Sequence, residues 1–364
     1  MTEGKPARRW LLRSVLLLLV LATAGVLAGA GWLLMEYPHH RGPGRGAVVE
    51  IELPAGTDLA GAARELAAQR ALLDPLWFEL YARVRGAGPW LRQGPILLYD
   101  NMTPLELLQR VARGFGSAEL RIVLPEGFSR FDIAARLERW GVCPRAQFIA
   151  ASEDRALLAE LEIAAPSAEG WLFPDTYQLR DDMTPPTLIR RFVANARRRL
   201  ASVLAEHAAD LERAQRELGF GLQQILTLAS IVEKEAKVPA EQRTIAGVFY
   251  NRLRDPAFSP KRLQADPTVS YGCALHPELP SCAGSDGKHI TRAMLGDPEN
   301  PYNTYRRDGL PPGPIANPGR RAIAAVLAPE THDFFYFVAI GDGRHRFSHS
   351  LSDHHAAVEA ARKP

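Results

Sequence analysis

The chain has 364 residues, of which 46% are hydrophobic and 23% are charged, a composition typical of a folded protein long enough for two domains. Its formal net charge is +3. The charges beyond the N-terminus are balanced and scattered, so the composition argues against a nucleic-acid-binding surface and favours a solvated exterior. Four of the basic groups stand together before residue 15: Lys5, Arg8, Arg9 and Arg13.

Residues 15–35 form an uncharged apolar run of about the length that a helix needs to cross a bilayer. The basic tail, 1–14, precedes this run, and a linker rich in His, Gly and Pro, 36–46, follows it. By the positive-inside rule the N-terminus stays in the cytoplasm and the rest is exported. A cleaved signal peptide is the alternative, but the run exceeds a usual signal core and Trp32 stands near its outer end. We therefore predict an uncleaved single-pass anchor in the cytoplasmic (inner) membrane.

Residues 47–118 read as a small α/β module. We expect strands at 47–53 and 95–98 and helices at 59–69, 76–84 and 103–114, the last capped by Thr103 and closed by glycine. The segment contains no clustered histidines, no paired acid and base, and no glycine-rich phosphate loop. These observations favour a binding or spacing module and leave a purely structural lead-in open.

Residues 119–364 are predicted to form a larger, mixed α+β domain, which makes the whole chain α+β. It begins with a strand at Glu119, contains an amphipathic helical hairpin that faces solvent over 187–218, and closes between 334 and 362 with a strand, a turn, a return strand and a helix. Cys273 and Cys282 bracket a short loop and could pair in an oxidising compartment. Cys143 is expected to be a buried hydrophobic residue.

One helix in this region, predicted over 225–239 and stopped by Pro239, carries two carboxylates near its end. Glu233 has Lys237 one turn further on, which suits a solvated ion pair. Glu235 instead has Ile231 and Val232 one turn back. A carboxyl held against apolar side chains has a raised pKa, which a general acid requires near neutral pH. Glu235 is therefore the catalytic candidate; the alternative is that both glutamates are ordinary surface residues.

Two segments after this helix, 262–272 and 300–319, are dense in amide, hydroxyl and tyrosine side chains with interspersed proline. We expect both to be loops stiffened by proline rather than regular helix or central strand. Amides donate and accept together and aromatic rings lie against sugar faces, so these loops suit a hydroxyl-rich ligand. Ordinary solvation of the polar side chains is the alternative.

The histidines near the C-terminus, including His345 and His354, are expected to be structural or substrate-contacting, and no metal site is predicted.

Several long motifs together resemble one known family, the endolytic murein transglycosylases, often called the YceG-like family. The resemblance implies a single-pass anchor, a LysM-like module at 47–118 and a catalytic domain at 119–364. This chain departs from the family pattern at 273–290 and at His355, where asparagine is usual. The motifs are VLPEGFS at 123–129, EGWLFPDTY at 169–177, ASIVEKEA at 229–236, RLQADPTVSYG at 262–272, YNTYRRDGLPPGPIANPG at 302–319 and HRFSHSLSDHH at 345–355.

The resemblance implies cleavage of the β-1,4 bond between N-acetylmuramic acid and N-acetylglucosamine within nascent peptidoglycan strands, near the membrane. The cleavage would be non-hydrolytic, would leave a 1,6-anhydro end and would release or terminate the strand, with Glu235 as the catalytic residue and no cofactor. Glycan strands, the membrane and cell-wall synthases are the implied partners.

One carboxyl can suffice for this reaction, because the substrate's own C6 hydroxyl replaces water as the nucleophile. The positive charge that develops on the sugar could be stabilised by the substrate's own N-acetyl oxygen or by Asp266, and the alternative for Asp266 is a turn cap before Pro267. A hydrolytic muramidase with Glu233 or Asp266 as second carboxylate, and a non-catalytic glycan-binding scaffold, remain as alternatives. For the loop residues placed in the sugar cleft, the alternative is that they hold the loops to each other. Residues assigned to substrate binding are Glu233, Gln264, Asp266, Thr268, Tyr271, Asn303, Thr304, Tyr305, Asn317, His345 and His354.

Overall fold

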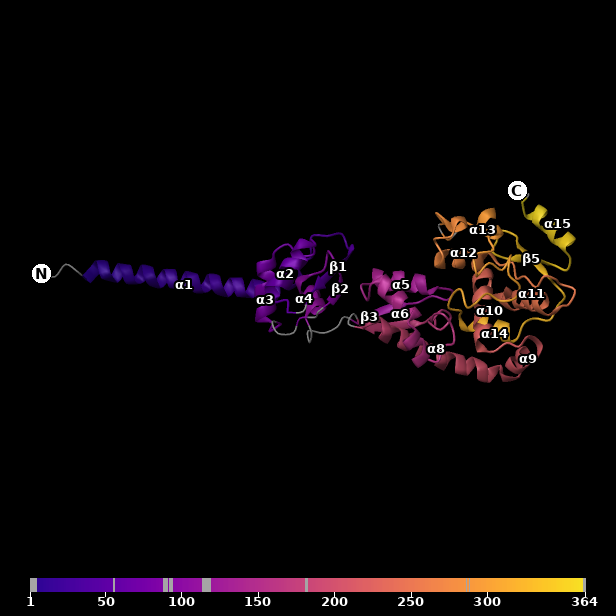
Figure 1. Cartoon of the computed structure of the whole chain (residues 1–364). Coiled ribbons are helices and arrows are strands. Elements are labelled where there is room, and N and C mark those ends of the chain that lie inside the picture. Colours follow the sequence, from indigo (N-terminus) through magenta and orange to yellow (C-terminus); the bar gives the residue numbers. More distant parts are fainter. Residues whose placement is uncertain are drawn as a thin grey trace. The chain divides into compact units, whose positions relative to one another are not determined.

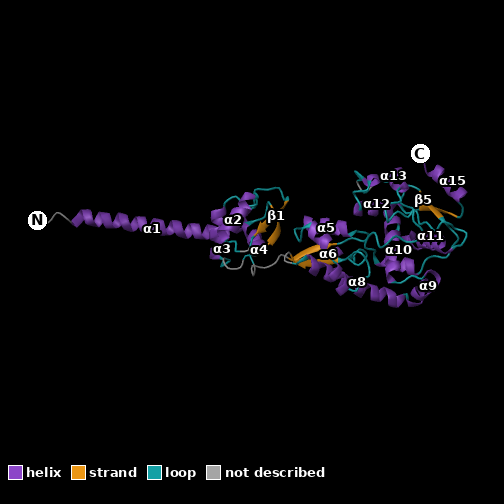
Figure 2. Cartoon of the chain, in the orientation of Figure 1, coloured by secondary structure: helices purple, strands orange, loops and turns teal. Residues whose placement is uncertain are grey.

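The computed structural model describes residues 5–362, except 55, 88–90, 92–93, 113–118, 181–182, 286 and 288. It is a mixed α+β structure in which helices predominate over short strands (Figures 1 and 2). The chain divides into two compact units. One comprises Met1–Leu120, Leu137–Pro144 and Leu179–Asp182, and the other Arg121–Arg136, Arg145–Gln178 and Met183–Pro364.

A long N-terminal helix, α1 (Lys5–Met35), begins the first unit, and a short 3-10 helix, η1 (Tyr37–His39), follows it. The stretch Ser14–His39 is long and apolar enough to cross a membrane, and none of its most apolar window is buried within the structure. The predicted apolar helix is therefore present. Its length and composition suit a membrane anchor or a signal sequence equally.

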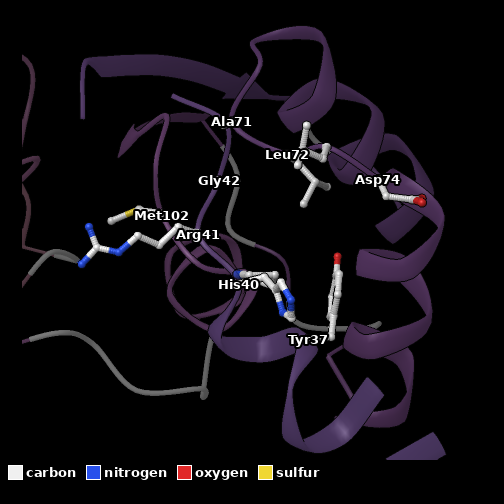
Figure 3. Close-up of a pocket in the computed structure, with 10 residues that line it drawn as sticks. Tyr37, His40, Arg41, Gly42, Ala71, Leu72, Asp74 and Met102 are labelled. Carbon is white, nitrogen blue, oxygen red and sulfur yellow. The ribbon is translucent and has the colours of Figure 1, made fainter. Parts of the chain in front are cut away.

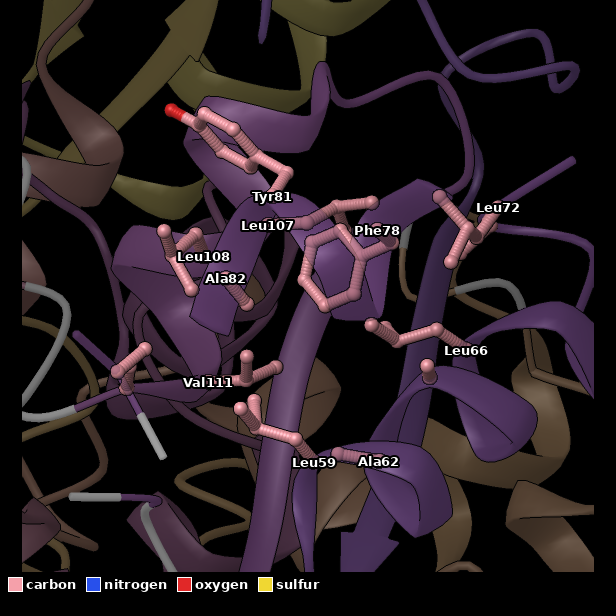
Figure 4. Packing of buried hydrophobic residues seen from close by; sticks show 14 of the residues in the cluster. Leu59, Ala62, Leu66, Leu72, Phe78, Tyr81, Ala82, Leu107, Leu108 and Val111 are labelled. Carbon is pink, nitrogen blue, oxygen red and sulfur yellow. The ribbon is translucent and has the colours of Figure 1, made fainter. Parts of the chain in front are cut away.

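The rest of the first unit is a small α/β module whose predicted elements are all present. Strand β1 (Val48–Leu53) pairs antiparallel with β2 (Gly94–Tyr99), so that Val48 lies opposite Tyr99. Figure 4 shows side chains of its buried core, among them Leu66, Phe78 and Leu107. The three helices are α2 (Leu59–Ala68), α3 (Pro75–Val84) and α4 (Pro104–Val111).

Helix α4 shows how local sequence fixes an element. Thr103 accepts a hydrogen bond from the backbone of Glu106, whose side chain accepts one from the Thr103 backbone, and this capping box defines the start of the helix. The helix ends at Val111, earlier than predicted, and the expected closing Gly114 lies outside the described residues.

Figure 3 shows a small hollow elsewhere in this unit, where Tyr37 and His40 face Leu72.

From residue 119 onward the chain consists of short strands and many helices. Strands β3 and β4 form one two-stranded sheet, and β5 pairs antiparallel with β6. The elements are β3 (Glu119–Val123), α5 (Arg130–Arg139), α6 (Arg145–Glu153), α7 (Arg155–Glu160), β4 (Thr176–Arg180), α8 (Pro185–Glu206), α9 (Ala208–Leu218), α10 (Leu222–Glu235), η2 (Pro239–Glu241), α11 (Gln242–Arg254), α12 (Asp266–Leu275), η3 (Pro280–Cys282), α13 (Arg292–Gly296), α14 (Arg320–Leu327), β5 (Tyr336–Ala339), β6 (His345–Ser348) and α15 (Leu351–Arg362).

Helix α10 is central to the second unit. Every residue from Ile225 to Val232 is buried, and α11, α12 and α14 pack around the helix. The predicted amphipathic stripe understates the burial of the helix, because burial extends beyond the apolar stripe to the polar Thr227 and Ser230. The hairpin α8–α9 is amphipathic, as predicted, since α8 buries one face that includes Leu188, Phe192 and Leu200.

The cysteines and the two polar segments differ in how closely they follow the predictions. Cys273 and Cys282 form a disulfide, and Cys143 is free and buried. The prediction that 262–272 contains no regular helix is wrong, because α12 begins at Asp266. Proline is tolerated in the first turn of a helix, where its missing N–H leaves no bond unmade. The segment 300–319 contains no helix or strand, as predicted.

Candidate active site

The end of α10 separates its two glutamates. The backbone turns extended at Ala236, so the helix ends at Glu235 and Lys237 is not one helical turn beyond Glu233. The predicted ion pair between Glu233 and Lys237 is therefore wrong. The Glu233 carboxylate instead accepts the backbone N–H of Gly319 at 3.0 Å, which caps the first turn of α14. The structure thus gives Glu233 a contact within the fold.

Glu235 is half-buried, and its carboxyl forms no hydrogen bond or ion pair with any residue that the structure describes. Burial raises the pKa of Glu235 to about 8, the negative charge of Asp266 raises it further, and Arg252 acts in the opposite direction. The carboxyl is therefore protonated near neutral pH and holds a proton that no internal partner engages. This is the state that a general acid needs before its substrate arrives.

A buried arginine lies near this carboxyl. Arg252 comes from α11, and its Nε donates to the Phe335 carbonyl at 2.7 Å while Nη1 donates to the Leu263 carbonyl. Burial lowers the pKa of Arg252 to about 10, so the guanidinium stays charged at neutral pH. Its field favours the ionised form of Glu235, which exists only after the proton has been given away. Sequence reasoning missed Arg252, although an arginine one turn after the inward-facing Val248 was a usable signal.

Asp266 and Tyr305 form the polar side of the site. The Tyr305 hydroxyl donates to Asp266 Oδ1 at 2.6 Å, and burial together with the charges of Asp266 and Glu235 raises the Tyr305 pKa above its usual value. Tyr305 is thus a neutral donor. Gln264 is exposed beside this pair with a left-handed φ of +51°, a strained backbone for a non-glycine residue. Its N–H donates to the Thr304 carbonyl at 3.1 Å, which holds that conformation.

Three predicted sugar-cleft residues are buried and tie the two polar segments together. Thr304 Oγ1 accepts the backbone N–H of Ala265 at 3.0 Å and lies 2.9 Å from Thr268 Oγ1. The Asn303 amide donates to the carbonyl oxygens of Met294 at 3.1 Å and Asp297 at 2.7 Å. These polar groups are occupied inside the fold. Thr268, Asn303 and Thr304 therefore position the segments that carry Asp266 and Tyr305.

Tyr271 and Asn317 meet a carboxyl that sequence reasoning did not single out. Glu169 is 2% exposed, and it accepts the Tyr271 hydroxyl at 3.0 Å, the Asn317 amide at 2.8 Å and the backbone N–H of Arg130 at 3.0 Å. Burial raises the pKa of Glu169 to about 7 against the effect of these donors. A lone acid between Ala168 and Gly170 in an apolar, aromatic stretch was the available signal.

The two predicted histidines lie at different places. His345 Nδ1 is 2.8 Å from Glu241 Oε2, and this contact ties β6 to η2. His354, on α15, stacks on Tyr336, and burial together with the positive charge of Arg252 lowers its pKa. Among the described residues no group of three His, Cys, Asp or Glu side chains could hold a metal ion.

A buried helix thus ends in an acid that has no partner among the described residues, within the electrostatic influence of Asp266 and Tyr305 from two polar segments, and we take this place as the candidate acid–base site. The chain belongs to the YceG-like family, whose sequence profile matches residues 51–360.

Named relatives agree with this assignment. An endolytic murein transglycosylase of Bacillus subtilis is 29% identical over 327 residues, covering 85% of this chain and 84% of that protein. An endolytic murein transglycosylase of Streptococcus pneumoniae is 25% identical and covers 84% of this chain, which spans 57% of that longer protein. A crystal structure of a protein described as YceG-like, from Listeria monocytogenes, superposes with a TM-score of 0.55 at 27% identity and covers 86% of this chain and 100% of the other.

Proposed function

We propose that this protein is a peptidoglycan lytic transglycosylase that cuts within glycan strands, with Glu235 as both acid and base. The observation that carries the proposal is the Glu235 carboxyl: half-buried, free of internal hydrogen bonds, and with a pKa raised to about 8. Membership of a family whose relatives are named endolytic murein transglycosylases supports peptidoglycan as the substrate and transglycosylation as the reaction.

In the proposed mechanism Glu235 gives its proton to the glycosidic oxygen while the bond from that oxygen to C1 of N-acetylmuramic acid breaks. The C6 hydroxyl of the same sugar then bonds to C1, and the Glu235 carboxylate takes the hydroxyl proton. No water enters and the acid is regenerated. Asp266, fixed by Tyr305 at 2.6 Å, provides negative charge for the positive charge that develops on the sugar ring.

We further propose that α1 anchors the protein in the cytoplasmic membrane with the remainder outside, and that 47–118 is a LysM-like glycan-binding module. The apolar stretch Ser14–His39 and the basic residues that precede it support the anchor and its orientation. Cutting near the membrane would release or terminate strands under synthesis, and synthases are the expected neighbours.

In the second unit we propose Gln264 as a substrate contact, because its exposed amide has no internal partner among the described residues.

The product ends test the reaction type. Full-length protein in detergent is incubated with uncrosslinked glycan strands beside Glu235→Gln, and the fragments are weighed by mass spectrometry. We expect fragments lighter by one water than hydrolysis products, absent in the variant. Reducing ends would establish a muramidase instead, with Asp266 as the candidate second carboxylate. Strands bound but uncut by the wild-type protein would support the glycan-binding scaffold.

A further inference from the structure

Helix α3 presents an apolar stripe to solvent. The stripe starts at Leu73, just before the helix, and continues at helical spacing along one side. Five large apolar side chains on one exposed line are unusual for a soluble surface. The stripe residues and their exposed fractions are Leu73 at 74%, Leu76 at 76%, Trp77 at 40%, Leu80 at 43% and Val84 at 55%.

The stripe is a second apolar face of a helix that already has one. Phe78, Tyr81 and Ala82 lie on a different side of α3 and are buried in the core of the first unit. That packing fixes the rotation of α3, so the exposed stripe cannot turn inward without losing the core. An apolar face held outward by the fold requires an apolar surrounding.

The stripe is continuous with the end of the apolar helix. The ring of Trp32 on α1 packs edge-on against Trp77 with centroids 5.3 Å apart, and Leu34 and Met35 beside it are 45% and 74% exposed. Trp32 is close to the end of the stretch that is long enough to cross a membrane, where tryptophan marks the boundary between lipid and water. Trp77, within the α3 stripe, therefore lies beside the part of α1 where the apolar span approaches its end.

We propose that α3 lies in the interface of the outer leaflet, with the α3 stripe buried among the lipids. The inference rests on the proposed placement of α1 in the membrane and adds a second point of attachment. The exposed guanidinium groups of Arg70 and Arg85, at the end of α2 and the end of α3, suit anionic lipid headgroups. Such an attachment holds the first unit against the bilayer instead of letting it swing on α1.

The burial of the α3 stripe among lipids can be tested by fluorescence quenching. An environment-sensitive fluorophore is attached to full-length Leu80→Cys, and the protein is placed in vesicles of phosphatidylethanolamine and phosphatidylglycerol that contain spin-labelled lipid as the quencher. Since Cys143 is buried and Cys273 is paired with Cys282, the introduced thiol is the one that reacts. Two matched positions serve as references. Leu21→Cys reports the apolar helix, and Glu52→Cys reports exposed β1, at the end of the unit away from α1 (Figure 1).

We expect the label at position 80 to be quenched several-fold more than the label at 52 and to emit at shorter wavelength. Quenching at 21 without quenching at 80 would overturn the inference and leave the anchor standing. Absence of quenching at 21 would overturn both. A label at 80 that is shielded from water yet unquenched, with energy transfer between copies, would show that a second copy covers the stripe and would also overturn the inference.

Discussion

Glu235 and Glu169 are two buried or half-buried carboxyls of one unit, and both have raised pKa values, about 8 and about 7. They differ in their partners. Glu169 accepts hydrogen bonds from Arg130, Tyr271 and Asn317, whereas Glu235 accepts none from the described residues. A raised pKa alone therefore does not mark a catalytic acid. What distinguishes Glu235 is that its proton and its lone pairs remain available to a ligand.

The comparison also separates two functions of the polar segments. Tyr271, Thr268, Asn303, Thr304 and Asn317 use their polar groups inside the fold, so they hold the site in place. Fewer polar side chains of 262–272 and 300–319 are therefore free to contact a ligand than the composition of these segments indicates.

The largest expected change in the free energy of unfolding comes from removing the Glu169 carboxyl. Glu169→Ala leaves the hydrogen-bond donors of Arg130, Tyr271 and Asn317 without their acceptor, and we expect it to lower the free energy of unfolding by about 3–5 kcal/mol. Chemical denaturation followed by circular dichroism measures this. Glu153→Gln is the control, because Glu153 pairs with the same Arg130 at 2.6 Å but is 45% exposed, and we expect about 0–1 kcal/mol. Equal losses would show that Glu169 is not the centre of the network.

A smaller change in the free energy of unfolding, in this case a gain, is expected from substituting Glu235. Its folded pKa of about 8 lies above the unfolded value, so its contribution to stability is complete below the unfolded pKa and is lost as the pH rises through about 8. Glu235→Gln removes this loss. We expect the variant to match the wild type at pH 4 and to exceed it by about 1–3 kcal/mol at pH 9. A variant that is less stable at pH 9 would mean that the carboxylate has an internal partner.

The smallest expected effect is a shift in the pH dependence of cleavage. The acid form of Glu235 is lost above its pKa, so kcat/KM should fall as the pH rises through about 8. Asp266→Asn removes a negative charge that raises this pKa, so the fall should move to lower pH by about one unit or less. Asp308→Asn makes the same charge change on the exposed side of the 300–319 segment and should leave the profile in place. Identical profiles for both variants would remove Asp266 from the field of Glu235.

Much of the fold was predictable because its signals are local. The strands and helices of the first unit follow from alternation, caps and turns, and α4 starts at the predicted Thr103 cap. The choice of Glu235 over Glu233 also rested on neighbours within one helical turn. It stays a prediction, because burial raises the pKa of both carboxyls.

The rest depended on contacts between distant segments. Glu169 meets Tyr271 and Asn317 from 102 and 148 residues away, which no local pattern reveals. Helix α12 was missed because its polar residues and proline were taken as signs of a loop, although Asp266 and Pro267 in its first turn are local signals of a helix start. The burial of Thr268 and Asn303 was hidden for the same reason, since satisfied polar groups look like solvated ones in a sequence.

The central claim is that the proton for bond cleavage comes from Glu235. The most direct test is the initial rate at which full-length protein forms anhydro-ended fragments at pH 7, compared between the wild type, Glu235→Gln and Glu233→Gln. We predict a loss of about 10²–10⁴-fold for Glu235→Gln, the contribution of a positioned general acid, and a loss of less than about tenfold for Glu233→Gln, whose amide oxygen can still accept the Gly319 N–H. Retained cleavage in Glu235→Gln, or an equal loss in both variants, would contradict the account.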